Sequence, residues 1–452
     1  MTVKEMIQQY EQEMLDKLAK LVAINSVEGV PSQDAPFGEA PKEALLCALQ
    51  MMEEDGFKTV NLDNYCGYAE MGEGEEVIGV IGHLDIVPAK QEDGWNTNPF
   101  EMVNDGTCVY GRGVSDDKGP VVASMMAMKI LRDLGFPLSK RIRLIMGTNE
   151  ETGSKCLKHY VECEGDVNYG FTPDGEFPGV YGEKGMVHGV YRSKKTELLS
   201  VLGEGAMNIV SGKCSARVVK NSYSTKKFKD YLNQNEMRYE IEEKEEYDDI
   251  TVYGLPAHAS TPELGKNAIS YLFMGLKEAG LQDAFVDFYC SHFGLHTDGE
   301  GLCKCEDEYG ALTLNTGVIS MKDGVIEGSI DIRFPVTLTS KQVVKMIEEN
   351  KEDEGGEIEV LSTTEPLYFP PDSPMIESLV KAYRDVTGDE ETQLMTMGGG
   401  TYAKGIGNTI AFGAGFPNRD YHIHNANEFA YIDELKLQVE IYVEALQNLL
   451  NL

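Results

Sequence analysis

A short apolar run and a second strand-like segment constrain the fold of this 452-residue chain more than any other feature, because each leads into polar residues. Residues 77–82 read Val-Ile-Gly-Val-Ile-Gly and lead into His83, and residues 142–146 read Ile-Arg-Leu-Ile-Met and lead toward Glu150. Short apolar runs of this length are typical of buried strands. Segments with helical patterning lie around them, at residues 3–24, 40–55 and 121–134. Strands that alternate with helices predict an α/β fold with a doubly wound, mostly parallel sheet.

The pattern changes after residue 182, which indicates a second domain. Shorter alternating runs are interleaved there with helical segments, and a proline-rich stretch at residues 366–374 then suggests a return crossing. A chain of this length is also too long for one ordinary domain. We therefore predict a discontinuous catalytic domain, residues 1–182 and 364–452, interrupted by an inserted α+β domain, residues 183–363.

Charge and composition narrow the partners of the chain. Its formal net charge of −35 argues against nucleic acids and anionic membranes as partners. There is no apolar stretch long enough to span a bilayer, and the N-terminus lacks the regions of a signal peptide. Nine cysteines, an odd number, are typical of reduced thiols in a cytoplasm. We therefore expect a cytoplasmic protein without a nucleic-acid or membrane partner.

Histidine and aspartate residues follow the predicted strands in a pattern that suits metal ions. His83 and Asp85 are two residues apart, so both side chains project to the same side. A carboxylate there can hold the second nitrogen of a metal-bound imidazole, although a local hydrogen bond alone also explains such a pair. Asp116 and Asp117 precede a predicted helix, and helix capping would explain either of them. Asp116 could instead bridge two cations.

Further candidate ligands lie later in the chain. Glu150 and Glu151 are neighbours at a strand end, where they point in different directions. One can therefore bind a metal while the other acts as a base, although an exposed acidic loop explains this pair equally well. Asp174 and His424 add a carboxylate and a second imidazole. Imidazoles and carboxylates are the ligands that a catalytic zinc pair requires.

The order of these motifs resembles the zinc-dependent aminoacylase and carboxypeptidase family of metallopeptidases. More narrowly, it is similar to the bacterial dipeptidase V, or Xaa-His dipeptidase, branch of that family. The most specific signatures are Asp-Asp-Lys-Gly-Pro and Pro-Asp-Gly-Glu-Phe-Pro. The motifs that carry the resemblance span essentially the whole chain, at residues 82–88, 111–113, 116–120, 148–153, 172–178, 182–185, 398–403 and 424–428.

The resemblance implies a site with two zinc ions. His83 and Asp174 would hold one ion, Glu151 and His424 would hold the other, and Asp116 would bridge them. Manganese or cobalt are alternatives, because sites rich in carboxylates accept several metals.

The resemblance also implies the catalytic and substrate-binding roles. Asp85 would orient a zinc-bound histidine, and Glu150 would be the general base for a metal-bridged water that becomes hydroxide. In the inserted domain, which would act as a lid, His258 resembles the histidine that stabilises the tetrahedral oxyanion. Arg333 resembles the arginine that grips the C-terminal carboxylate of the substrate, with an ordinary ion pair as the alternative. Asn208 is similar to a lid asparagine that contacts substrate.

The implied function is hydrolysis of the peptide bond of unblocked dipeptides, a small peptide substrate, by a cytoplasmic enzyme. A lid of this length implies a monomer, because one chain can then cover its own site. The nearest alternative is an N-acyl amino acid deacylase that uses the same pair of metals, and a more distant one is a non-catalytic member of the family. His422, two residues before His424, could either support the site or be exposed.

One further group of cysteines and histidines, between residues 290 and 305, is not predicted as a metal site, because it lacks the usual Cys-x2-Cys spacing of closed zinc sites. We expect free thiols and a surface helix there instead. The glycine-rich motifs lack the spacing of nucleotide-binding loops, and there is no Gly-x-Ser-x-Gly elbow. The group of cysteines and histidines that is not predicted as a metal site consists of Cys290, His292, His296, Cys303 and Cys305.

Overall fold

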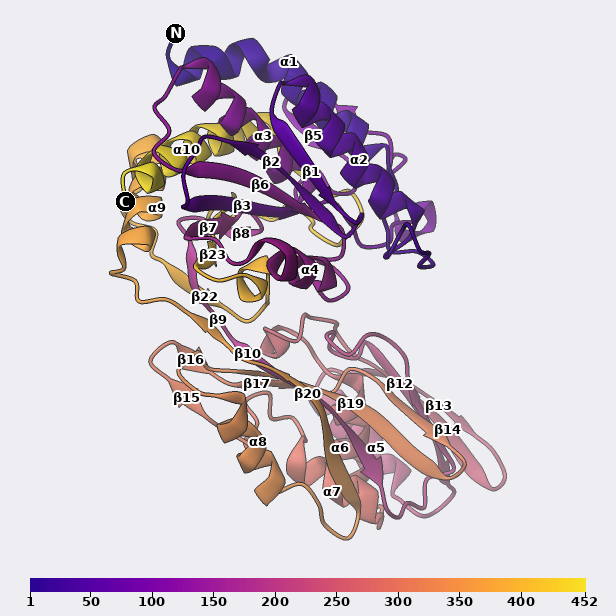
Figure 1. Ribbon diagram of the computed structural model, residues 1–452. Helices are drawn as coiled ribbons and strands as arrows, with labels where there is room; N and C mark the ends of the chain where they lie inside the picture. Colours follow the sequence, from indigo (N-terminus) through magenta and orange to yellow (C-terminus); the bar gives the residue numbers. More distant parts are fainter. The chain divides into compact units, whose positions relative to one another are not determined.

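The computed structural model describes all 452 residues, which form two compact units. Unit 1 consists of Met1–Tyr181, Phe369–Met395 and Gly400–Leu452, and unit 2 consists of Gly182–Tyr368 and Thr396–Gly399. The chain therefore leaves unit 1 after Tyr181, returns at Phe369, and adds a short second segment to unit 2 before it completes unit 1 (Figure 1). No helix in either unit combines the length and apolar composition that crossing a membrane requires.

The centre of unit 1 is a parallel arrangement of strands. β3 (Val77–His83) lies between β6 (Arg141–Gly147) and β7 (Tyr169–Thr172) and runs parallel to both. β23 (Thr409–Ala411) continues the parallel order beside β7. Every residue of β3 is buried, as expected for a central strand that is covered on both faces.

Antiparallel strands extend this sheet on the β6 side. β2 (Cys66–Met71) pairs with β6, and β1 (Lys58–Leu62) pairs with β2. On the opposite side, β9 (Val180–Glu183) pairs with β23 through Val180 and Ala411. The sheet is therefore parallel at its centre and antiparallel on both sides.

Helices cover both faces of the unit 1 sheet (Figure 1). A Cβ atom on Gly82 of β3 would lie 2.4 Å from Val121 on α3, so this helix packs against the strand where only glycine leaves room. A Cβ atom on Gly147 would lie 2.0 Å from the Tyr402 hydroxyl on the other face. One face carries α1 (Val3–Val22), α2 (Glu39–Glu54), α3 (Lys118–Asp133) and α10 (Ile432–Leu450), with α9 (Pro374–Thr387) beside α10, and the other carries α4 (Lys155–Glu164) and η3 (Tyr402–Gly405).

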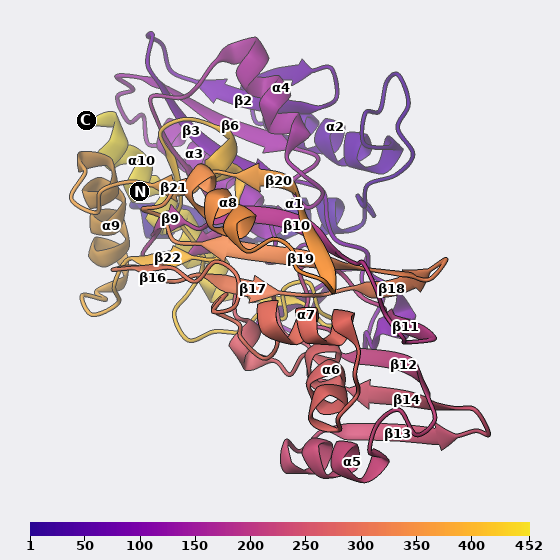
Figure 2. The same cartoon turned by 90° about the horizontal axis from the view of Figure 1, so that it is seen from below.

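Unit 2 is built on a long antiparallel sheet with helices packed against it (Figure 2). Burial alternates strictly along β10 (Gly185–Ser193), which is the pattern of a strand with one face on the core. The helices are α5 (Thr225–Gln234), α6 (Ala268–Glu278), α7 (Ala284–His292) and α8 (Ser340–Glu349). The strand order is β13 (Arg238–Glu243), β14 (Tyr247–Tyr253), β12 (Lys213–Val219), β11 (Ser200–Gly203), β18 (Ile319–Lys322), β19 (Val325–Phe334), β10 and β20 (Gly356–Thr364), and β17 (Thr313–Asn315) also pairs with β19.

The α/β class predicted from the sequence, with a doubly wound sheet and a second α+β part, is confirmed. The prediction of a surface helix near Cys290 is wrong. This segment is α7, whose Phe285, Phe288 and Tyr289 side chains are fully buried. The reason is that Phe285 and Tyr289 pack against Tyr191 of β10, and Phe288 belongs to the same hydrophobic core of unit 2. The cysteines are all free thiols.

Candidate metal centre

The parallel strands of unit 1 bring three of the candidate ligands to one edge of the sheet. His83 is the last residue of β3, Glu151 follows β6, and Asp174 follows β7. The carboxyl ends of parallel strands meet at the same edge, which is where α/β proteins bind their ligands. Asp116 reaches this edge from the turn before α3, and His424 reaches it from a loop near the C-terminus.

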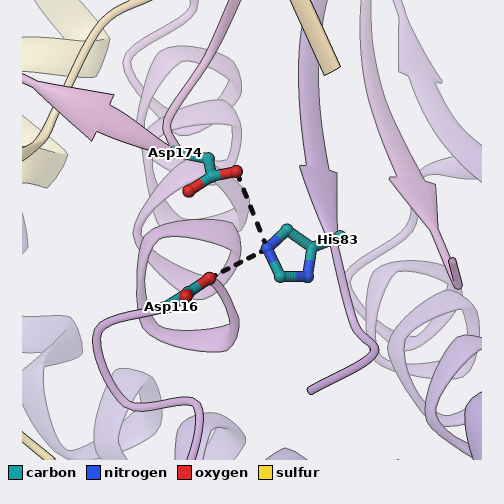
Figure 3. A group of neighbouring side chains, drawn as sticks. All are labelled: His83, Asp116 and Asp174. Atoms are coloured by element: carbon teal, nitrogen blue, oxygen red, sulfur yellow. Dashed lines mark hydrogen bonds and ion pairs between the residues drawn. The ribbon is translucent and has the colours of Figure 1, made fainter. Parts of the chain in front are cut away.

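His83, Asp116 and Asp174 form a first group that could hold a metal ion (Figure 3). The His83 Nε2 atom lies 3.0 Å from Asp116 Oδ1 and 3.8 Å from Asp174 Oδ2. All the ligand atoms of this group lie within 4.8 Å of one another. His83 is almost completely buried, so its ring is fixed in place rather than free to move in solvent.

Asp116, Glu151 and His424 form a second group of the same kind. The His424 Nε2 atom lies 2.8 Å from Asp116 Oδ2 and 3.2 Å from Glu151 Oε2. Asp116 therefore presents one carboxylate oxygen to each histidine, which is the arrangement that a bridging ligand requires. The pKa of Asp116 is held below its usual range because hydrogen bonds from His424 and His83 outweigh the effect of burial.

The chemistry of these residues fits a bound cation. Two imidazoles and three carboxylates converge, and such ligands suit zinc and related divalent metals. The Oε1 atom of Glu151 is buried without a hydrogen-bond partner. An unpaired buried carboxylate oxygen is unfavourable, and a metal ion would satisfy it.

Asp85 supports this site in a different way from the one expected from the sequence, in which its carboxylate holds the His83 ring. The ring nitrogen Nδ1 of His83 lies 3.0 Å from the backbone carbonyl of Asp85 but 3.6 Å from its carboxylate. The carboxylate instead accepts hydrogen bonds from the backbone amides of Glu150 and Glu151, at 3.0 and 3.1 Å. Asp85 thus orients His83 through its main chain and fixes the glutamate pair through its side chain.

Glu150 belongs to neither ligand group although it is the immediate neighbour of Glu151. Burial raises the pKa of Glu150 well above its usual range, and the charges of Asp174 and Glu151 raise it further. A carboxylate beside a metal centre that is not itself a ligand can accept a proton and release it again.

Asp117 has a role that the sequence did not reveal. It occupies the N-cap position of α3, but its side chain makes no capping hydrogen bond. Its Oδ2 atom instead accepts a hydrogen bond of 3.0 Å from the backbone amide of His83. The capping interpretation is therefore wrong for this side chain, and Asp117 helps to position His83, a candidate ligand. His422 is exposed, belongs to neither ligand group, and lies edge-on to Phe429.

Arg333, the candidate substrate-binding arginine, lies in β19 of unit 2 and is 5% exposed. Its Nε and Nη2 atoms donate to the Asp331 carboxylate at 2.7 and 3.0 Å, and Nη1 donates to the Gly398 carbonyl at 2.7 Å. The ion pair considered from the sequence is therefore present. Together with the Gly398 contact it uses three of the five N–H groups of the guanidinium and leaves one each on Nη1 and Nη2.

His258 and Asn208 are exposed and lie close together in unit 2. The backbone carbonyl of Asn208 accepts a hydrogen bond from Ala259 at 2.8 Å, and Ile209 forms a β-bridge with His258. The backbone amide of Ser260 donates to His258 Nδ1 at 3.2 Å. Because Nδ1 accepts, the proton of the neutral ring is on Nε2, which makes Nε2 a hydrogen-bond donor.

At one edge of the α/β sheet lie two imidazoles, a carboxylate that both share, and a neighbouring glutamate that belongs to neither ligand group. This arrangement is that of a metal-dependent hydrolase. Comparison with known proteins agrees with this class. The chain belongs to peptidase family M20/M25/M40, whose family model matches residues 79–448. The resemblance inferred from the sequence motifs is thus confirmed at the level of the family.

Two relatives match over nearly their whole length. The chain is 35% identical over 457 residues to "Putative dipeptidase YtjP" of Bacillus subtilis (strain 168), with 97% of each chain covered. It is 34% identical over 470 residues to "Putative dipeptidase SH1171" of Staphylococcus haemolyticus (strain JCSC1435), with 99% of each covered.

Solved structures share the fold. Human carnosine dipeptidase 1 matches with a TM-score of 0.62 and 18% identity, over 100% of this chain and 98% of that one. The di-peptidase Dug1p from Saccharomyces cerevisiae matches with a TM-score of 0.60 and 17% identity, over 100% and 98% of the two chains.

Proposed function

We propose that this chain is a di-zinc dipeptidase of the dipeptidase V branch that hydrolyses the peptide bond of unblocked dipeptides. The observation that carries the proposal is the Asp116 carboxylate, which faces two histidines, each with a second carboxylate close by. The dipeptide substrate is supported by relatives named as dipeptidases, which are similar to this chain over nearly its full length.

In this proposal the five ligands hold two zinc ions, with manganese or cobalt as substitutes. His83 and Asp174 would bind one ion, Glu151 and His424 would bind the other, and Asp116 would be shared between them. When bound, such a pair of cations lowers the pKa of a water molecule and polarises the scissile carbonyl.

Glu150 acts as the general base. It takes a proton from the attacking water and passes it to the nitrogen of the leaving amine as the peptide bond breaks. This role needs a carboxylate that is near the metals but not bound to them, and Glu150 is outside both ligand groups. The Asp85 carboxylate supports the role because it fixes the backbone amides of Glu150 and Glu151.

The residues of unit 2 would recognise the substrate. Arg333 would bind the C-terminal carboxylate through the N–H groups that Asp331 and Gly398 do not occupy. His258 would donate from Nε2 to the oxyanion of the tetrahedral intermediate, and Asn208 would contact the substrate beside it. We further propose that the enzyme works as a monomer in the cytoplasm.

Hydrolysis of one free dipeptide and of its N-acetylated counterpart tests the proposed function. We expect the zinc-loaded protein to cleave only the free dipeptide and a chelator to abolish this activity. Release of acetate instead would assign the same site to an N-acyl amino acid deacylase. Comparable cleavage of a tetrapeptide would contradict the restriction to dipeptides.

We expect Arg333→Lys to raise the KM for a dipeptide by about 10- to 100-fold, because a lysine cannot form the paired hydrogen bonds of a guanidinium. The KM for the corresponding dipeptide amide, which lacks the carboxylate, should change little. The measurement is kcat and KM for both substrates.

Arg192→Lys is the matched control for this substitution. Arg192 lies in the neighbouring strand β10 and forms ion pairs with Glu327 and Glu359 at the surface of unit 2. It should leave both KM values unchanged. An equal loss on the acid and the amide in Arg333→Lys would show that the substitution only disturbs the fold.

A further inference from the structure

Glu428 joins the C-terminal ligand loop to the segment that carries Asp116. It is completely buried and comes directly before β25 (Phe429–Tyr431). β25 pairs with β5 (Cys108–Tyr110), and the Gly111 amide donates to the Glu428 carbonyl at 3.1 Å. The main chain around Glu428 is therefore bound to the strand that leads into the Asp116 loop.

The carboxylate of Glu428 is surrounded by hydrogen-bond donors from that loop. The backbone amides of Gly113, Ser115 and Asp116 donate to it at 3.1, 2.9 and 3.2 Å. The Arg112 guanidinium donates from Nη1 at 2.7 Å and neutralises its charge. Successive backbone amides that curve around one anion form a concave binding site of the kind that protein loops make for phosphate.

This arrangement controls where Asp116 can lie. The amide of Asp116 donates to Glu428, while both carboxylate oxygens of Asp116 face the histidines His83 and His424. His424 itself precedes Glu428 by four residues in the same loop. The buried Glu428 carboxylate thus connects the Asp116 loop to the His424 loop, and each of these loops supplies a candidate metal ligand.

Contacts of the residues beside Glu428 strengthen this connection. Asn427 accepts a hydrogen bond from the Asn96 amide and donates to the Gly94 carbonyl, at 2.7 and 3.1 Å. Between these two residues, the Trp95 ring lies 5.3 Å from the Arg112 guanidinium. His424 and Asn427 have positive φ angles, which non-glycine residues rarely adopt, so the loop depends on such contacts to hold its conformation.

We propose that Glu428 is a positioning residue that organises the Asp116 loop around its carboxylate and thereby sets the affinity of the site for metal. The proposal rests on the proposed function only in taking Asp116 and His424 as metal ligands. Glu428 belongs to neither group of candidate ligands, and it acts through the backbone of Asp116.

The test compares Glu428→Gln with Glu70→Gln. Glu70 is a matched control because it is also a buried carboxylate in unit 1 that pairs with an arginine, Arg143, and it contacts none of the ligand loops. Both substitutions should lower thermal stability, because each leaves a buried arginine without its full partner. Glutamine cannot replace Glu428, since its NH2 group would face donors instead of accepting from them.

Two measurements on metal-free protein separate positioning from stability. We expect zinc titration to show an affinity about 10- to 100-fold lower in Glu428→Gln and unchanged in Glu70→Gln, as for other residues that support metal ligands. Hydrogen exchange should accelerate at amides 113–116 in Glu428→Gln only. Glu428→Asp, which keeps the charge but shortens the side chain, should recover part of the affinity.

An equal loss of zinc affinity in both variants, or unchanged exchange at amides 113–116 in Glu428→Gln, would overturn the proposal. Neither readout involves peptide hydrolysis. A failure of the dipeptidase assignment is therefore distinguishable from a failure of the role of Glu428.

Discussion

Glu150→Gln is expected to lower kcat for a free dipeptide by about 10³-fold while the protein keeps its full zinc content. Glutamine has nearly the shape of glutamate but cannot accept the proton of the attacking water. Glu150 is outside both groups of candidate ligands, so its replacement should not release metal. The expected defect is therefore in the chemical step and not in the assembly of the site.

The neighbouring substitution Glu151→Gln gives the sharpest contrast. Glu151 lies 3.2 Å from His424 in the second ligand group, so its loss should weaken zinc binding. Excess zinc should restore much of the activity of Glu151→Gln and none of the activity of Glu150→Gln. The measurements are kcat at increasing zinc concentration and the zinc bound per chain. Unchanged turnover in Glu150→Gln or Glu150→Ala would instead favour a different base or a non-catalytic protein.

Asp116→Asn is expected to abolish high-affinity binding of both metal ions and, with it, all measurable hydrolysis. Asp116 is the one residue shared by the two ligand groups. An asparagine side chain has a single carbonyl oxygen and no charge, so it cannot serve two cations. Zinc that binds only the native state at a thousand times its Kd stabilises a protein by about 4 kcal/mol. Saturating zinc should therefore raise the Tm of the unmodified protein and leave that of Asp116→Asn nearly unchanged.

Asp298→Asn is the control for this effect of zinc on Tm. Asp298 belongs to a third group of possible ligands, with His296 and Glu300, on the surface of unit 2. Its carboxylate already forms an ion pair of 2.7 Å with Lys304. The rise of Tm with zinc should persist in this variant. A rise that disappears in Asp298→Asn but persists in Asp116→Asn would place the stabilising metal outside the proposed centre.

Three of the five candidate ligands end or follow parallel strands of one sheet, whereas Asp116 and His424 lie in loops and were singled out by the resemblance of their motifs. His83 ends an apolar run, and Glu151 and Asp174 follow strands that are parallel to it. Parallel strands bring such residues together by their geometry, whatever the distance along the chain. The class of the fold followed from the same alternation of strands and helices.

The supporting contacts could not be predicted in this way. The Asp85 carboxylate was expected to hold the His83 ring, but it accepts hydrogen bonds from the backbone amides of residues 150 and 151 instead. Asp117 sits where a helix cap is expected, yet the amide of His83 is its partner. Glu428 finds its donors more than 300 residues earlier in the chain. Local patterns contain no information about pairings between distant loops, so only the folded structure reveals them.

The discontinuity of unit 1 has a consequence for how the protein is made on the ribosome. The strand β23, the His424 loop and the helix α10 all belong to the last part of the chain, after unit 2 has been synthesised. Until this part emerges, β7 lacks its neighbour β23, α3 lacks its partner α10, and the second ligand group lacks its histidine. A growing chain therefore cannot complete the metal centre. The second ligand group is complete only after His424 and the segments beside it, with β23 and α10, have been added to the chain.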